Sequence, residues 1–275
     1  MTHRVPSSLS VIIPALNEAA VLEETLAAAG RAEGVEVIVV DGGSRDGTPE
    51  VAARSGARVV RARPERARQM NLGASLARGR ILLFLHADTL LPDGYDEHLR
   101  RILTEPGVVA GAFRFGLRER RRGLGWVTAG ARLRSRFFHL PYGDQALFLR
   151  REVFDRVGGF PEIPIMEDVV FVRRLRACGR IVIGSLEART SARRYLRHGV
   201  LRTVLLHQLL LAGHVLGVSP SGLLRLRGGA SAKETAESSA GLDQEREEGG
   251  DGQQSEEGRG HQPSDHHAAK SAIEL

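Results

Sequence analysis

Lysine is almost absent from this chain of 275 residues, since the only two lysines are Lys233 and Lys270 near the C-terminus. Cysteine occurs once, at Cys178, so the chain can form no internal disulfide and cannot hold a metal on several cysteines. Aromatic residues make up only 5% of the chain, and no basic stretch is interleaved with them as in nucleic-acid-binding surfaces. We therefore expect no nucleic-acid partner.

Long apolar runs are also missing. Asn17 and Glu18 interrupt the N-terminal run too early for a signal peptide, which predicts a cytoplasmic protein. The uncharged stretch Thr203–Val218 has 16 residues, whereas a membrane-spanning helix needs about 20. We interpret residues 198–227 as an apolar C-terminal helix that either packs on the domain or lies in a membrane interface, at the inner face of the cell membrane.

Charge is distributed unevenly along the chain. Residues 228–275 contain 4 basic and 11 acidic side chains, which leaves 35 basic and 22 acidic ones in residues 1–227. The resulting net charge of +13 suits a phosphate-bearing ligand, nucleic acid or an anionic membrane surface, although a GC-rich genome would enrich arginine equally well. Residues 228–275 are rich in Gly, Ser, Glu and Gln without any aromatic residue, and we expect an acidic disordered tail.

Short apolar runs alternate with helical patterns in the first half of the chain. We expect strands at 9–13, 35–40, 57–61 and 81–85, and helices at 18–29, 46–55, 65–78 and 93–103. This alternation predicts an α/β fold with a parallel, doubly wound sheet and helices on both faces. The second half is less regular, with strands expected at 108–115, 146–149 and 181–183 and helices at 124–138, from 151 and at 166–178.

Carboxylates follow three of the expected strands. Glu18, Asp41 and Asp88 each come shortly after an apolar run. Ligands of open α/β sheets bind beyond the carboxyl ends of the strands, so we expect these three side chains to converge on one site. His86 adds an imidazole two residues before Asp88, and a metal held there could dock a diphosphate. For Asp88 alone, a surface loop that merely starts the next helix is an equally good interpretation.

Several segments together resemble the inverting glycosyltransferases of family 2, which have a GT-A fold. The segments are SVIIPALNE at 10–18, EVIVVDGGSRDGT at 36–48, ILLFLHADT at 81–89, GDQALFLRREVFDRVGGF at 143–160 and the pair Glu167-Asp168. The resemblance implies a GT-A domain at 1–197 with a Rossmann-like, mostly parallel central sheet. Through LFLHADT, GDQ and the Arg-Arg-aromatic segment at 193–195, the chain resembles the branch encoded near radical-SAM and arsenosugar pathway enzymes.

The resemblance implies a metal-dependent donor site. Asp88 falls on the last Asp of a D-x-D-type motif that holds a divalent metal, Mn²⁺ or Mg²⁺, and His86 replaces its first Asp. Arg68 falls where a basic residue meets the base or the diphosphate, although a surface arginine is an equally good interpretation. The donor nucleotide-binding residues implied in this way are Pro14, Ala15, Glu18, Asp41, Arg68 and His86.

An inverting transfer also needs a base that takes the proton of the acceptor hydroxyl. The family uses the Asp of its Glu-Asp pair, which is Asp168 here. The alternative is that this pair only favours the positive start of its own helix. The residues assigned to the acceptor and the transferred sugar are Gly111, Asp144, Gln145, Glu167 and Arg194.

We therefore expect a transfer from a nucleoside-diphosphate sugar to a small or lipid-like acceptor hydroxyl. Processive members end in Q-x-x-R-W, of which residues 191–195 keep Arg194 but lack the Gln and the Trp, so a single transfer fits better than polymerisation. The first alternative, a sugar-phosphate nucleotidyltransferase, would need a glycine-rich loop after the first strand, and PALNEAA contains no glycine. The second, a non-catalytic nucleotide-binding protein, would need no acid at position 168.

Overall fold

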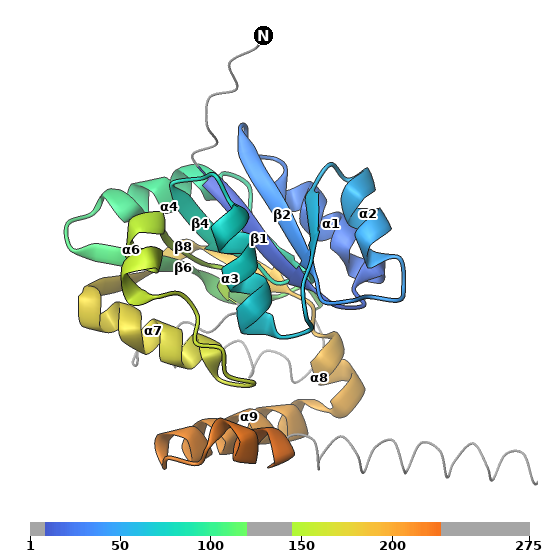
Figure 1. Cartoon of the computed structure of the whole chain (residues 1–275), viewed down its shortest axis with the longest axis vertical. Helices are drawn as coiled ribbons and strands as arrows, with labels where there is room; N and C mark the ends of the chain where they lie inside the picture. The colour runs from blue at the N-terminus through green and yellow to red at the C-terminus, as the bar shows by residue number, and fades with distance from the viewer. Residues whose placement is uncertain (1–8, 120–144, 227–275) are drawn as a thin grey trace, which may run out of the picture. The chain divides into compact units, whose positions relative to one another are not determined.

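The computed structural model describes residues 9–119 and 145–226, which fall in one compact unit (Figure 1). The expected helix at 124–138, the candidate residue Asp144 and the tail from 228 onward lie outside the described residues.

Strands and helices alternate through the first half, as the apolar pattern predicts. The strands are β1 Leu9–Ala15, β2 Val35–Asp41, β3 Arg58–Arg61, β4 Ile81–Phe84, β5 Thr89–Leu90, β6 Val108–Leu117, β7 Leu147–Arg150 and β8 Arg180–Thr190. The helices are α1 Ala19–Ala29, α2 Thr48–Arg54, α3 Arg66–Leu76, α4 Tyr95–Thr104, α6 Arg151–Val157, α7 Glu167–Cys178, α8 Arg193–His198 and α9 Val200–Val215.

The strands form one sheet in the order β3-β2-β1-β4-β7-β6-β8-β5. The neighbours β3, β2, β1 and β4 are parallel, and so are β6 and β8, which confirms the mostly parallel α/β sheet. The second half is not purely parallel, however, because β7 runs antiparallel to both β4 and β6, and β5 runs antiparallel to β8.

The strand expected at 181–183 is much longer in the structure. β8 extends from Arg180 to Thr190 and pairs with β6 as far as the pair Leu117–Thr190. Beyond Ile183 its residues are a mixture of buried, half-buried and exposed positions and include Glu187 and Arg189, so an apolar run detects only the beginning of the strand. The extension matters because it carries the chain to the site edge of the sheet.

Two apolar layers cover the two faces of the sheet. Alternate residues of β1 point to opposite sides: Leu9, Val11 and Ile13 join α1, α2 and α4, whereas Ile12 joins α3, α6 and α7. Three helices therefore pack on each face, as the doubly wound prediction requires, and Figure 1 shows α3, α6 and α7 on the face nearer the viewer.

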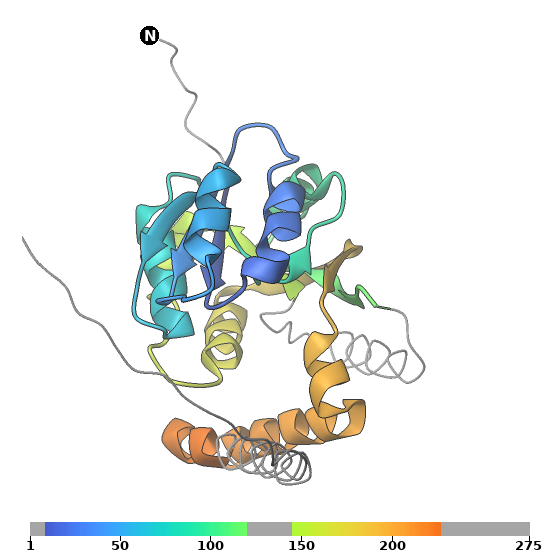
Figure 2. The same ribbon diagram turned by 90° about the vertical axis from the view of Figure 1, so that its right-hand side faces the viewer.

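After β8 the chain turns away from the sheet through α8 into α9 (Figure 2). One face of α9 packs Leu206 and Leu210 against Ile165, Met166 and Leu223. No helix within residues 9–119 and 145–226 is both long and apolar enough to cross a membrane.

Candidate active site

The carboxyl ends of β1, β2 and β4 lie side by side at one edge of the sheet. Ala15 pairs with Asp41 in the β1–β2 register, and the N–H of Leu85 donates to the carbonyl of Ile12 at 3.0 Å. Gln69, buried on α3, donates its side-chain amide to the carbonyls of Ala15 at 3.0 Å and Val40 at 2.7 Å. This amide ties the ends of β1 and β2 together, a role that the sequence alone did not indicate.

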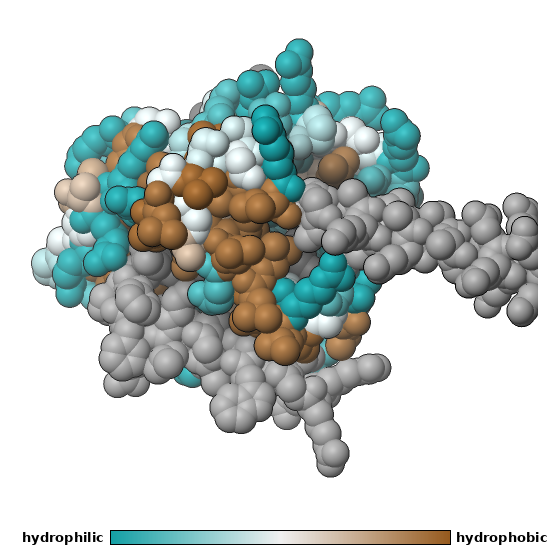
Figure 3. Space-filling view, turned by 90° about the horizontal axis from the view of Figure 1, so that it is seen from below, coloured by the Kyte–Doolittle hydropathy of each residue, from teal (hydrophilic) through white to brown (hydrophobic). Residues whose placement is uncertain are grey.

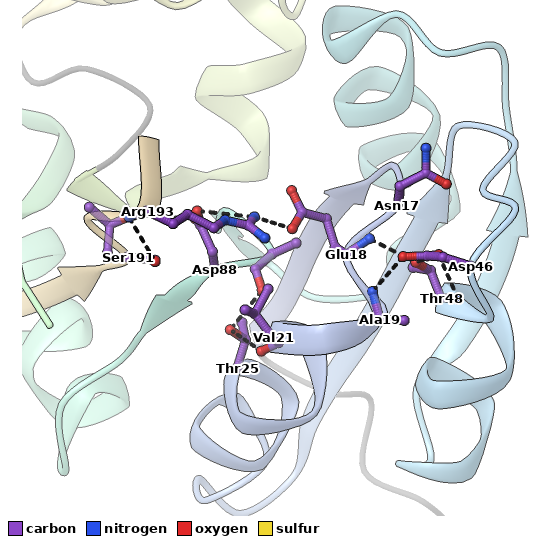
Figure 4. A network of polar contacts seen from close by, with 12 residues as sticks. Asn17, Glu18, Ala19, Val21, Thr25, Asp46, Thr48, Asp88, Ser191 and Arg193 are labelled. Atoms are coloured by element: carbon purple, nitrogen blue, oxygen red, sulfur yellow. Dashed lines mark hydrogen bonds and ion pairs between the residues drawn. The ribbon is translucent and has the colours of Figure 1, made fainter. Parts of the chain in front are cut away.

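The loop after β1 is held by the loop after β2 (Figure 4). The hydroxyl of Thr48 accepts the N–H of Glu18 at 2.9 Å, and the carboxylate of Asp46 accepts the N–H of Ala19 at 3.1 Å. Thr48 also donates its hydroxyl to Asp46 at 2.5 Å, and this hydrogen bond is the main cause that lowers the pKa of Asp46. The contacts fix the backbone from which the side chain of Glu18 projects.

Asp41 faces the interior of its own turn. Its side chain is 0% exposed and accepts the backbone N–H groups of Gly43 at 3.1 Å and Ser44 at 3.2 Å. These two backbone donors hold the carboxylate of Asp41 in the turn at the edge of the site. Its direct contact with the nucleotide base stays a prediction.

A bridge of three charges joins the end of β1 to the end of β4. The guanidinium of Arg193, on α8, contacts Oε2 of Glu18 and lies 3.4 Å from Oδ2 of Asp88. Thr190, the last residue of β8, donates its hydroxyl to Oδ1 of Asp88 at 3.2 Å. Burial acts to lower the pKa of Arg193, but Glu18 and Asp88 outweigh it, and the pKa is raised. Figure 4 shows the guanidinium between the two carboxylates.

A small pocket brings together residues that the sequence placed in three different segments. Its lining includes Pro14 from β1, His86 after β4, and Asp168 in the first turn of α7. Arg66 of α3 also lines the pocket, and its Nε lies 3.6 Å from Oε1 of the largely buried Glu167. The remaining lining residues are Met70, Phe84, Leu85, Leu147, Phe160 and Val172. One carboxylate, one imidazole and one guanidinium thus meet in an otherwise apolar hollow.

Arg68 and Gly111 are predicted site residues whose surroundings the structure describes. Arg68 pairs through Nε with Glu65 at 2.8 Å and Glu162 at 3.0 Å, whereas Arg66 lines the pocket with Asp168. Residues two apart on a helix point in different directions, and the contact of Arg68 with the donor stays a prediction. Gly111 packs in the core of the sheet, where a Cβ would lie 2.3 Å from the ring of Phe148.

Gln145 and Arg194 are the other candidates for the acceptor side. Gln145 is buried and donates its side-chain amide to the carbonyl of Phe113 at 3.1 Å. Arg194 lies in α8, but its side chain is not among those described. Its neighbour Arg193 makes the contacts to Glu18 and Asp88, and the role of Arg194 at the acceptor stays a prediction.

The donor atoms at Asp88 fit a divalent cation that binds together with a phosphate-bearing ligand. Among the residues that the structure describes, no three His, Cys, Asp or Glu side chains form a ready-made metal cluster. Mg²⁺ and Mn²⁺ prefer oxygen ligands, and Mg²⁺ is commonly held by only one or two carboxylates plus substrate phosphates. Asp88 and Glu18 offer such carboxylates at one point, where they now share the positive charge of Arg193.

Sequence comparison identifies the first part of the chain. The family model described as "Glycosyl transferase family 2" matches residues 10–160. A curated relative, "Uncharacterized protein MT1568" of Mycobacterium tuberculosis, is 36% identical over 107 residues, which cover 36% of this chain and 34% of the relative. The match thus spans about a third of that relative's length. The family match ends before Asp168 and Arg193, whose places are known from the structure alone.

Solved structures share the fold. TarS 1–349 of S. aureus superposes with a TM-score of 0.55 at 19% identity, covering 67% of this chain and 60% of TarS. Its complex with UDP gives a TM-score of 0.54 over the same shares. Glucosyl-3-phosphoglycerate synthase of Mycobacterium tuberculosis, in complex with phosphoglyceric acid, gives 0.50 at 24% identity, covering 66% of this chain and 70% of the synthase. At these identities the likeness establishes the GT-A fold.

Proposed function

This chain belongs to glycosyl transferase family 2, and on that premise we propose that it moves one sugar from a nucleoside-diphosphate sugar to an acceptor hydroxyl, with inversion and with a divalent metal. The observation that carries the proposal is the pocket that Asp168 and His86 line together, with Asp88 of the Glu18–Arg193–Asp88 bridge two residues after His86 in the chain. Base and charge-binding groups then lie at the same edge of the sheet, where ligands of this kind of fold bind.

Asp168 is the group in the pocket that we assign as general base. In the transfer, the acceptor oxygen forms a bond to the anomeric carbon, the bond from that carbon to the diphosphate oxygen breaks, and the hydroxyl proton passes to the Asp168 carboxylate. The guanidinium of Arg66 lies in the same pocket and is oriented by the largely buried Glu167. Arg66 thus adds a positive charge beside the carboxylates of Glu167 and Asp168.

Asp88, with Glu18 beside it, is the group that we assign to the donor diphosphate through a metal. A bound Mn²⁺ or Mg²⁺ would neutralise charge that develops on the leaving diphosphate. Arg193 already supplies one positive charge between the two carboxylates, and this arrangement supports a site for a cation at this point. The fold relative TarS was determined with UDP, and we extend this class of ligand to the present chain.

The finer assignments are part of the same proposal. We infer a small or lipid-like acceptor and a single transfer, since residues 191–195 lack the Gln and Trp of processive members. Membership of the branch encoded near radical-SAM and arsenosugar pathway enzymes rests on LFLHADT and GDQ and on the Arg-Arg-Tyr segment at 193–195.

The test is an isosteric change of the proposed base, Asp168→Asn. We expect the release of nucleoside diphosphate from UDP-, GDP-, CDP- or dTDP-sugars to fall by about 10²–10⁴-fold, the usual contribution of a general base. Nucleoside-diphosphate affinity, measured by calorimetry, should stay within about twofold, since the Asp88 side is untouched.

Asp96→Asn is the matched control, because Asp96 also lies in the first turn of a helix, α4. Either change removes a charge that favours a helix start, so each should lower the free energy of unfolding by about 0.3–1 kcal/mol. Only Asp168→Asn should lower turnover. Undiminished turnover in that variant would remove Asp168 from the mechanism.

A further inference from the structure

Exposed large apolar side chains are concentrated near the end of the described chain. Among the described residues ten such side chains are exposed, and nine of them lie between 196 and 226, the exception being Leu16. The nine are Leu196, Leu201, Leu205, Leu209, Val215, Leu216, Val218, Leu224 and Leu226. Scattered exposed leucines are ordinary, but a group confined to one segment marks an interaction surface.

The exposed leucines of α9 form a stripe along its outer face. Leu201, Leu205 and Leu209 follow one another at intervals of four residues, and Leu216 continues the line just after the helix. Leu201 is 72% exposed and Leu216 is 83% exposed. The inner face is already used, because Leu210 is buried against Ile165 and Leu223. The outer stripe is therefore a second apolar face that the fold of the described residues leaves open to solvent.

Figure 3, seen from the side on which α9 lies, shows a band of apolar surface crossing this part of the molecule. Burying a leucine side chain is favourable, so leaving several of them in water costs the free protein stability. A partner that covers the outer stripe would recover that free energy.

The charged side chains in the segment that carries the stripe are all arginines. Residues 188–227 contain seven arginines and no aspartate or glutamate. Arg197 is exposed near the end of α8, Arg202 is exposed in the first turn of α9, and Arg225 is exposed in the short helix at 220–226. A helix with an apolar stripe and arginines at its margins matches the pattern of helices that lie in a bilayer interface and bind anionic lipids.

We propose that α9 docks this protein on an anionic lipid bilayer, with the leucine stripe in the acyl boundary and Arg197, Arg202 and Arg225 at the phosphate headgroups. With 16 residues α9 lies on the bilayer and does not cross it. α8 joins α9 to Arg193, so docking holds the Glu18–Asp88 edge close to the lipid surface. The inference stands on surface chemistry and does not depend on the proposed transfer reaction.

The acidic tail is the other segment with complementary charge, but its composition does not suit the stripe. Residues 228–275 carry 11 acidic side chains, yet their only large apolar residues are Leu242, Ile273 and Leu275. Such a segment can neutralise arginines, but it cannot cover a row of leucines. An anionic lipid bilayer can both neutralise the arginines and cover the leucine stripe.

The test is co-sedimentation of the full chain with vesicles of pure phosphatidylcholine and with vesicles that contain 30% phosphatidylglycerol. We expect at least tenfold stronger binding to the anionic vesicles. The double change Leu205→Ser/Leu209→Ser should weaken that binding at least tenfold. Arg202→Gln should weaken it about fivefold, the factor that corresponds to about 1 kcal/mol per basic residue near an anionic surface.

Arg54→Gln is the matched control, since Arg54 is exposed on α2, far from α9 in the chain, and should bind vesicles like the unchanged protein. Unchanged circular dichroism of each variant excludes loss of the fold. Absence of binding to anionic vesicles would overturn the proposal, and so would binding that both leucine changes leave intact. A dimer that Leu205→Ser/Leu209→Ser dissociates, with no vesicle binding, would identify the stripe as a self-association surface instead.

Discussion

Asp88 is a carboxylate shared between a cation and a hydroxyl donor. Its Oδ2 faces Arg193 at 3.4 Å and its Oδ1 accepts the hydroxyl of Thr190 at 3.2 Å. A divalent cation at Asp88 would have to compete with the guanidinium, because both need the same carboxylate oxygens. The bridge is partly exposed, so its net contribution to stability is small, about 0–1 kcal/mol for such pairs. Its main effect is on the affinity of Asp88 for a divalent cation.

Arg193→Gln should therefore raise the affinity of the protein for Mn²⁺ by several-fold while hardly changing its stability. The reason is that the variant leaves Asp88 and Glu18 without the internal cation that now occupies their oxygens. Calorimetric titration with Mn²⁺ alone measures the effect. Arg197→Gln, which replaces an exposed arginine of the same helix, serves as the control. Equal Mn²⁺ affinities in the two variants would show that Arg193 does not compete for this site.

Single residues also show where the sequence was informative. Glu18, His86 and Asp88 could be assigned to the site because each follows an apolar run that ends at the same sheet edge. Arg193 could not, because it lies 105 positions from Asp88 and follows a strand whose second half has no apolar run. The pairing of β8 with β6 and β5 brings it there.

At the scale of elements, α3 carries two residues of the site and packs closely against β1. Gln69 ties the ends of β1 and β2, and Arg66 enters the pocket. The helix approaches β1 closely because Gly73 has no side chain: a Cβ there would lie 2.4 Å from Cγ2 of Ile12. From the sequence alone, Gly73 is merely a residue that weakens a helix, by about 1 kcal/mol relative to alanine.

Gly73→Ala should accordingly destabilise the protein by about 1–3 kcal/mol, the usual cost of overpacking, although helix propensity alone predicts a gain. Urea unfolding followed by circular dichroism gives the change. Ser75→Ala, an exposed position on the same helix, should be neutral or slightly stabilising. A stabilised Gly73→Ala variant would show that α3 does not approach β1 as closely as the structure indicates.

The predicted bounds of helices and strands were accurate where the apolar pattern is regular. They were too short where buried and exposed residues are mixed, as in β8. The helix expected at 65–78 buries Ala67, Met70 and Ala74 on one side, as its spacing predicts. β8 was underestimated because half of its residues face away from the core. The antiparallel direction of β7 could not be predicted either, since a run of four apolar or long side chains carries no information on the direction of its neighbours.

At the scale of the molecule, the sheet joins a nearly regular parallel half to a mixed half that completes the site. β1, β4 and the loops after them present Pro14, Glu18, His86 and Asp88, whereas the mixed half contributes Asp168 and Arg193. The family match covers the parallel half together with β6 and β7 and ends at residue 160. It therefore ends before the two residues that the mixed half contributes.

The most direct test of the proposed donor site is a thermal-shift panel of UDP, GDP, CDP and dTDP, each with and without Mn²⁺, on the unchanged protein and on Asp88→Ala. A ligand that binds only the folded state raises its stability by about 2.7 kcal/mol at 100 times Kd, which raises the midpoint by several degrees in a domain of this size. We predict that one of the diphosphates raises the midpoint only with Mn²⁺ and that Asp88→Ala abolishes this rise. A full Mn²⁺-dependent rise in Asp88→Ala, or no rise with any diphosphate in the unchanged protein, would contradict the account.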